Sequence, residues 1–275
     1  MIDAHHHLWR YTTEEYDWIG QSMKSLRRDF LPQDLDAATS GTDVTGTVVV
    51  QARQTLDETR WLLDLADRSE IMLGAVGWAP LAAPSFAKIM EEFAGRQKLL
   101  GLRHVVQSEA PGFMHGAAFN QGIERLRDLK LVYDILIHEG QLPEAIEFVD
   151  RHPRQVFVLD HIAKPRIREG VLEPWAQHIH ELARRENVWC KVSGLVTEAD
   201  WTKWSAASLR PYLDIVVDAF GCQRLMAGSD WPVCLVASDY AGWFNVLKAY
   251  FASFSAEEQH AVFEGSARAV YGLAS

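Results

Sequence analysis

Residues 2–9 read Ile-Asp-Ala-His-His-His-Leu-Trp, a short run in which three consecutive histidines follow an acidic residue and lead into an apolar segment. A purification tag would explain three histidines in a row, but not the residues on either side of them. Residues two apart on a strand point to the same face, so His5 and His7 can reach one ion or ligand together, and His6 between them faces the other way. We also expect Asp3 to face away from this pair. We predict a strand over 2–7 with a functional pair at its carboxyl end.

Seven further segments share the shortness of this run and its richness in β-branched and aromatic residues: 47–51, 71–78, 99–104, 131–138, 156–161, 188–193 and 225–230. Several of them, such as residues 48–50, are apolar without alternation, which is typical of parallel strands covered on both faces. Helical spacing of apolar residues fills the gaps, as at residues 59–66 and 142–149. Eight strand-helix units predict an α/β fold, a single (β/α)8 TIM barrel in which residues 1–275 form one domain.

The bulk composition favours a small-molecule partner. The chain has 275 residues, of which 48% are hydrophobic, and a formal net charge of -10, which argues against nucleic acid or an anionic membrane as a partner. No run approaches the ~18 apolar residues of a membrane helix, and the first residues do not resemble a secretion signal. Cys190, Cys222 and Cys234 have no CxxC spacing, so we expect them to be buried or inert in a reducing, cytoplasmic setting.

Chemically active residues close nearly every predicted strand: His5 and His7, Arg103 and His104, His138, His161, Lys191, and Asp230. A polar residue often ends a strand simply because the chain returns to solvent, and that explanation serves for any one of them. The return of the chain to solvent does not explain the whole set well, because five of the 11 histidines close predicted strands. In a parallel barrel these ends meet on one face, where the active sites of such barrels lie.

The sequence is compatible with two kinds of active site, one that holds a metal ion and one that works without it. His5, His7, His138 and Asp230 offer nitrogen and oxygen donors for one zinc ion, with a coordination position left for water. Without an ion, a buried carboxylate such as Asp230 could take a proton from water while a cation polarises a carbonyl, and His161 could assist.

Substrate contacts are expected from cations at the same face and from the long irregular segment 8–32. Arg103 and Lys191 suit an anionic or hydroxyl-rich ligand, although each could be an ordinary surface charge. His104 could contact the substrate or only close its strand. The segment 8–32 would lie over the barrel mouth, where Trp18 could stack on a sugar ring or pack into the core.

Five motifs in order resemble the amidohydrolase-2 group of lactonases: residues 3–9, 101–104, 159–165, 191–195 and 228–232. The resemblance spans the whole predicted barrel. It implies that Asp230 deprotonates the attacking water, that His161 assists at the carbonyl or leaving oxygen, and that His5 and His7 line the metal side. Some members of the group resemble metal enzymes and work without an ion. The carboxylated lysine of binuclear relatives belongs where this chain has Arg103 and His104, so the resemblance implies one ion at most.

Within that group the chain is most similar to the sugar lactonases. The resemblance therefore implies a cytoplasmic hydrolase of carboxylic ester bonds, which opens an L-fucono- or L-rhamnono-lactone in the catabolism of a deoxy sugar. Two other classes of function stay in view. Related barrels decarboxylate aromatic acids with one zinc ion, and a binding protein without catalysis would need no chemistry at these residues. Neither the exact lactone, nor its ring size, nor a homo-oligomeric state follows from the sequence.

Overall fold

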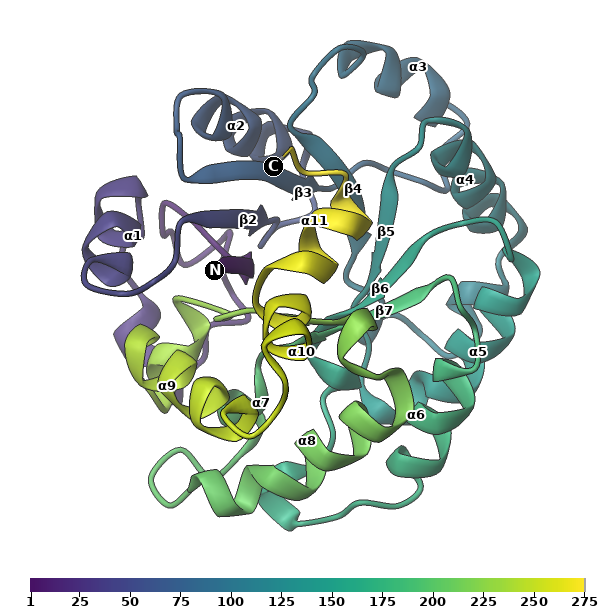
Figure 1. Ribbon diagram of the computed structural model, residues 1–275. Coiled ribbons are helices and arrows are strands. Elements are labelled where there is room, and N and C mark those ends of the chain that lie inside the picture. The colour runs from purple at the N-terminus through teal and green to yellow at the C-terminus, as the bar shows by residue number, and fades with distance from the viewer. Residues whose placement is uncertain (275) are drawn as a thin grey trace.

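Eight parallel strands form one sheet in the computed structural model, which describes residues 1–274 (Figure 1). The strands pair in the order of the chain: β1 (Ile2–His6), β2 (Gly46–Val50), β3 (Met72–Gly77), β4 (Leu99–His104), β5 (Val132–Ile135), β6 (Phe157–Leu159), β7 (Val188–Val192) and β8 (Leu225–Ala227). The segment after β8 returns to β1, where the Asp230 N–H donates to the carbonyl of His5 and the His7 N–H to that of Trp231. These bonds close the sheet, and the predicted (β/α)8 barrel is confirmed.

Helices surround this barrel: α1 (Pro32–Thr39), α2 (Leu56–Asp67), α3 (Phe86–Glu92), α4 (Ala117–Asp128), α5 (Leu142–Arg151), α6 (Trp175–Ala183), α7 (Leu195–Glu198), α8 (Ala206–Phe220), α9 (Tyr240–Phe251), α10 (Ala256–His260) and α11 (Ser266–Tyr271). Their starts follow the local sequence. Thr55, for example, caps α2 by accepting a hydrogen bond from the N–H of Glu58. In Figure 1, α10 and α11 (yellow) cross the front of the barrel and bring the carboxyl end of the chain close to the amino end.

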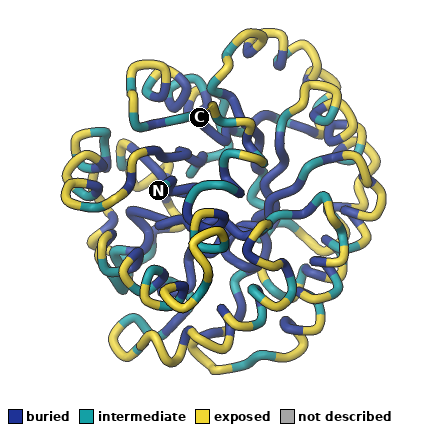
Figure 2. The backbone as a smooth tube through the Cα atoms, viewed as in Figure 1, coloured by how far each residue is buried: buried dark blue, intermediate teal, exposed yellow. Residues whose placement is uncertain are grey.

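Two apolar cores follow from strands that are covered on both faces. A large outer core lies between the strands and the helices, and a smaller cluster fills the barrel interior with residues such as Val48, Val76 and Val158. Tyr271 of α11 belongs to the inner cluster, so the last helix plugs the barrel at the end where the strands begin. Figure 2 shows the buried backbone gathered at the centre of the ring and the exposed backbone on its rim.

Three strands end two or three residues earlier than predicted. β5 stops at Ile135, β6 at Leu159 and β8 at Ala227, so His138, His161 and Asp230 follow their strands instead of ending them. The reason is visible at two of these sites, because His161 and Asp230 have φ angles of 53° and 55°. A left-handed residue turns the chain out of the extended conformation and interrupts pairing with the neighbouring strand.

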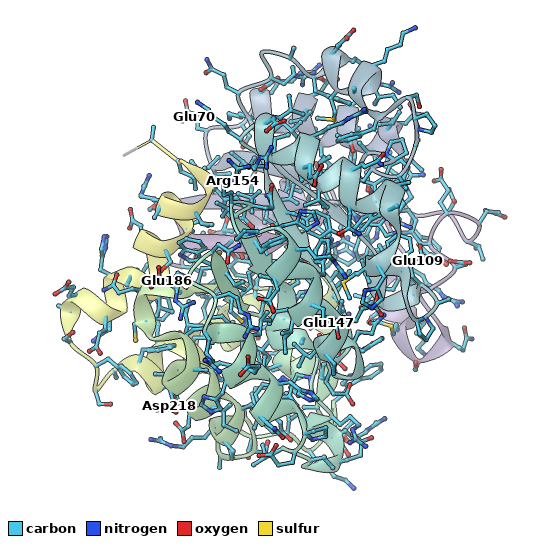
Figure 3. The ribbon with its side chains drawn as sticks, turned by 90° about the vertical axis from the view of Figure 1, so that its right-hand side faces the viewer. Glu70, Glu109, Glu147, Arg154, Glu186 and Asp218 are labelled. Atoms are coloured by element: carbon cyan, nitrogen blue, oxygen red, sulfur yellow. The ribbon has the colours of Figure 1, made fainter. Side chains whose placement is uncertain are left out.

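The outer surface carries the negative charge of the chain. Exposed carboxylates such as Glu147, Glu186 and Asp218 point away from the helix layer in Figure 3. The three cysteines are buried and unbridged, as predicted. None of the helices in residues 1–274 is long and apolar enough to cross a lipid bilayer.

Candidate active site

A cavity of about 500 Å³ opens at the carboxyl ends of the strands. Its walls include His7, Arg103, His161 and Asp230 from four strand ends, and Trp18 from the irregular segment before α1. The volume is in the range of small-molecule sites. The predicted position of the site, over the barrel mouth and beneath the segment 8–32, thus coincides with a real hollow.

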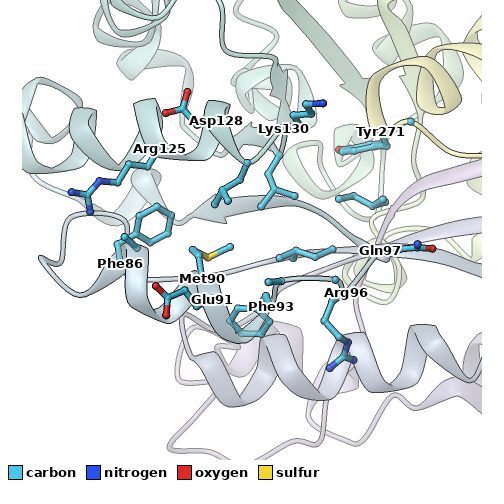
Figure 4. Close-up of a pocket in the computed structure, with 18 residues that line it drawn as sticks. Phe86, Met90, Glu91, Phe93, Arg96, Gln97, Arg125, Asp128, Lys130 and Tyr271 are labelled. Carbon is cyan, nitrogen blue, oxygen red and sulfur yellow. The ribbon is translucent and has the colours of Figure 1, made fainter.

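A larger cavity of about 890 Å³ lies at the opposite end of the barrel (Figure 4). Phe86, Met90 and Phe93 of the α3 region form one side of it, and Tyr271 lies at its edge. None of its described lining residues is a histidine or a cysteine. The face where strands begin supports stability in this fold more often than chemistry, so we place the reaction at the smaller cavity.

A local irregularity of β1 sets the histidine pair. The register between β1 and β2 shifts between Asp3 and His6. The Nε2 atoms of His5 and His7 lie 3.2 Å apart. Asp3 accepts hydrogen bonds from Ser229 and Tyr240, and His6 pairs with the Thr47 hydroxyl. The expectation that His5 and His7 share a face, with Asp3 and His6 turned away, is confirmed.

Hydrogen bonds at Nδ1 orient the imidazole rings of His7 and His161. The His7 Nδ1 lies 2.8 Å from the carbonyl oxygen of Val50, which only accepts, so Nδ1 carries the proton and Nε2 keeps its lone pair. The His161 Nδ1 lies 2.8 Å from the Ser193 hydroxyl, which leaves its Nε2 free to face the site. Burial lowers the pKa of both rings, to about 4 for His161. At neutral pH both are uncharged bases.

Asp230 lies where these rings meet. Its Oδ1 is 3.4 Å from the Nε2 of His7 and 3.8 Å from those of His5 and His161. Burial by itself raises the pKa of this carboxyl, yet the net pKa lies below its ordinary value, with the charge of Lys164 among the causes. Asp230 is therefore an ionised carboxylate that can accept a proton or bind a cation.

The same atoms fit one divalent cation. His5, His161 and Asp230 offer ligand atoms within 4.8 Å of one another, and the Nε2 of His7 completes the set. In a tetrahedral zinc site with bonds of about 2.0–2.1 Å, neighbouring ligand atoms lie roughly 3.3 Å apart. The separations of 3.2 and 3.4 Å around His7 are close to that value. Neutral imidazole and carboxylate donors are those that zinc prefers.

A network of buried charged side chains lies in the barrel interior, next to His5. Lys191 is fully buried and pairs with Asp134 and, at 3.1 Å, with Asp160. Asp160 also pairs with Arg103 at 2.9 Å and lies 3.3 Å from the Nδ1 of His5. Two cations and two carboxylates balance here, which removes much of the cost of burying each one.

Asp134 and Asp160 are buried members of this network that were not among the residues predicted from the sequence. Asp134 was the one charged residue inside an otherwise apolar predicted strand, 131–138, and Asp160 directly precedes His161. A charge at the centre of a buried strand needs a partner, and that signal could have linked Asp134 to Lys191.

Four predicted site residues are absent from the cavity wall: His5, which is buried but still lies beside His7 and Asp230, and three that lie away from them. Lys191 is sealed beneath His5, because its position on β7 turns it into the barrel interior, and it does not line the mouth. His104 is held by Trp78 and Glu109 and stacks on Phe113. His138 begins a turn three residues after β5 ends, and it faces a separate small pocket instead of His5, His7 and Asp230.

Arg103 and Trp18 do reach the cavity. Arg103 is 3% exposed, and its Nε has no hydrogen-bond partner among residues 1–274. Trp18 is 43% exposed, although its ring packs edge-on against Trp9. A large exposed aromatic at the rim of a polar cavity is suited to stack on a ring-shaped ligand.

Comparison with known proteins agrees with this geometry. The model of the amidohydrolase family matches residues 2–273. An L-fucono-1,5-lactonase of Burkholderia multivorans is 41% identical over 284 residues, covering 99% of this chain and 96% of the relative. A second L-fucono-1,5-lactonase, from Burkholderia ambifaria, is 37% identical and covers 88% of this chain and 84% of the relative.

A solved structure gives the same result in three dimensions. The crystal structure of an amidohydrolase from Burkholderia multivorans with bound zinc superposes with a TM-score of 0.96 at 42% identity, and each chain covers 99% of the other. The match extends over every strand of the barrel and all the cavity walls described above.

Proposed function

The chain belongs to the amidohydrolase family, and we propose that it is a lactonase, which hydrolyses the lactone of a sugar acid to the open-chain aldonate. The observation that carries the proposal is the 41% identity to an L-fucono-1,5-lactonase, which runs almost from end to end of both chains. An L-fucono- or L-rhamnono-type lactone is the substrate that we propose. Such a ligand is uncharged and rich in hydroxyl groups, and the cavity offers it charged and polar walls together with Trp18.

Asp230 acts as the base of the proposed reaction. The lactone lies in the cavity under Trp18, with its carbonyl close to His161. Water attacks the carbonyl carbon while Asp230 takes one of its protons. The bond between that carbon and the ring oxygen then breaks, and the ring oxygen receives the proton with the help of His161. The new carboxylic acid loses a proton to solvent, so one lactone and one water give one aldonate and one proton.

The proposal includes a divalent cation that the site can bind. His5, His7 and Asp230 would bind it, with His161 beside them. When bound, it would polarise the lactone carbonyl and favour attack by water. Arg103 and the base Asp230 are in place without it, so the structure of the site is compatible with turnover in either state.

The test is hydrolysis of a panel of aldonolactones by the purified protein, followed as acid release at constant pH. L-fucono-1,5-lactone and an L-rhamnono-lactone head the panel, and aromatic carboxylic acids are included with release of CO2 as the signal. We expect rapid acid release from one stereochemical series. Release of CO2, or no turnover of any lactone, would contradict the proposal.

Metal removal is tested in the same assay. The protein is dialysed against a chelator, its zinc content is measured, and zinc is then added back. Activity that falls with the zinc content and returns with the ion makes His5 and His7 essential ligands. Activity that stays constant while the ion is lost assigns catalysis to Asp230 and the cations of the site alone.

A further inference from the structure

Three cations line the active-site cavity, and two of them are already paired. Arg53 forms ion pairs with Glu15 and Glu58. Arg103 is paired with Asp160. Lys164 lines the cavity, yet its ammonium group forms no hydrogen bond or ion pair with any side chain or backbone group of residues 1–274. Lys164 is therefore the cation of this cavity that has no ion-pair partner among residues 1–274, and it also borders the smaller pocket that Glu139, Glu169 and Glu198 line.

An unusual backbone carries Lys164 to this place. Residues His161, Ile162, Ala163 and Lys164 all have φ angles between 48° and 61°, although none is glycine. Such a left-handed turn is unfavourable for residues other than glycine and persists only when its surroundings hold it. Here the indole of Trp175 donates to the carbonyl of Ile162, and the N–H of Lys164 donates to the carbonyl of His161.

The turn has a consequence for the site. It places His161 and Lys164, three residues apart, on the wall of the same cavity as Asp230. An extended segment would instead carry residues 161 and 164 roughly 10 Å apart. Backbone strain that brings two polar side chains into one cavity is typical of functional sites.

The proposed reaction creates negative charge inside this cavity. The lactone is neutral, but its carbonyl oxygen becomes an oxyanion when water adds, and the product is a carboxylate. A cation that meets this oxygen stabilises the transition state more than the bound substrate, and that difference is what accelerates a reaction. Arg103 is less able to do so, since Asp160 already compensates its charge.

We propose that Lys164 binds the carbonyl oxygen of the lactone and, after ring opening, the carboxylate of the aldonate. The inference rests on the proposed lactonase activity and adds to it the group that recognises the charge formed in the reaction. No proton need leave Lys164. Its ammonium group donates a charge-assisted hydrogen bond to this oxygen in the substrate, the transition state and the product. Asp230 accepts the proton that the attacking water loses.

The experiment compares K164M and K164R with the wild type, and with K88M as the matched control. Lys88 is an exposed lysine on α3, outside the cavity. Two quantities are measured for each protein: kcat and KM on the best lactone of the panel, and the dissociation constant of the corresponding aldonate by calorimetry. Binding of the aldonate does not depend on turnover, so it reports on Lys164 separately from the chemistry.

For K164M we expect kcat/KM to fall roughly 10²- to 10³-fold, mostly in kcat, as for the loss of one oxyanion donor. Aldonate binding should weaken roughly tenfold or more, because a charge-assisted hydrogen bond is lost. K164R should recover part of both, and K88M should match the wild type. An active wild type whose aldonate affinity is unchanged in a folded K164M overturns this inference alone, whereas an inactive wild type overturns the lactonase proposal.

Discussion

Asp230 carries the proposed chemistry at the scale of single residues. Its carboxylate is ionised and surrounded by the Nε2 atoms of three histidines at 3.4 to 3.8 Å. D230N removes the negative charge and the proton acceptor but keeps the shape of the side chain. We expect lactone hydrolysis to fall by about 10²- to 10⁴-fold, the usual contribution of a general base. A variant that unfolds at the wild-type temperature and retains full activity would show that another group activates water.

Glu58 provides a pH-dependent prediction away from the histidines. Its carboxylate accepts hydrogen bonds from the backbone N–H groups of Ala52 and Arg53, which shape the wall of the cavity. Burial outweighs these bonds and raises the pKa of Glu58 from 4.5 to about 7. The folded protein therefore binds more protons than the unfolded chain between these values, and its free energy of unfolding falls as pH rises through that window.

The variant E58Q tests whether the free energy of unfolding falls as pH rises through this window. Glutamine does not ionise, so the variant lacks the fall in stability between pH 4.5 and 7. Relative to the wild type, E58Q should gain stability across this window, by roughly 2–3 kcal/mol at most. Denaturant unfolding of both proteins at pH 4.5, 6 and 7.5 measures the difference, and a difference that is the same at all three values would contradict the prediction.

At the scale of elements, the turns that follow β6 and β7 position His161. Gly194, at the start of α7, has a φ angle of 72°. A Cβ atom at this position would lie 2.8 Å from the Nδ1 of His161, closer than real Cβ contacts allow. The absence of a side chain at residue 194 therefore lets His161 face Asp230 and bond to Ser193.

G194A should move His161 and lower activity more than stability. We expect kcat/KM to fall at least tenfold, with a loss of about 1–2 kcal/mol in unfolding free energy from the left-handed backbone. The matched control is G140A, since a Cβ atom at Gly140 meets nothing within 4 Å and its backbone is not left-handed. Equal effects of the two substitutions on kcat/KM would show that the contact with His161 is unimportant.

The whole molecule is tied together by the charges inside the barrel. Lys191 from β7, Asp134 from β5 and Asp160 beyond β6 meet in the interior, and Tyr271 of the last helix donates to Asp134. Chain segments more than 130 residues apart along the sequence therefore share one set of hydrogen bonds. The network also lies directly below His5, so it links the packing of the barrel to the geometry of the site.

K191M leaves two buried carboxylates without their shared cation. We expect the free energy of unfolding to fall by about 3–5 kcal/mol, as for other buried ion pairs broken on one side. The double variant K191M/D134N removes one of the stranded charges and should recover part of that loss. Urea unfolding of the wild type, the single variants and the double variant gives the coupling energy, and a double variant no more stable than K191M would contradict the pairing.

The local pattern of the chain was sufficient to predict the barrel, the eight strand segments and the presence of His5, His7, Arg103, His161 and Asp230 at one face. Hydrophobic periodicity and strand length act over a few residues and are therefore readable from sequence. The positions at which β5, β6 and β8 end could not be read in this way. The left-handed residues His161 and Asp230 interrupt the chain after β6 and β8, whereas β5 ends without such a residue. The residue types at positions 161–164 do not predict a left-handed turn.

The order of residues along the chain is enough to show which polar groups are available and which strand each one follows. Only the tertiary structure decided how they are grouped, because the direction of a side chain depends on a register shift in β1, on positive φ angles and on the closure of the barrel. Those features put Lys191 beneath the site and leave His138 in a separate pocket. They also pair Asp134 and Asp160 with distant cations, and they bring Lys164 to the cavity with no ion-pair partner in the described part of the chain, residues 1–274. Ion pairs form between groups that meet in space, whatever their separation along the chain.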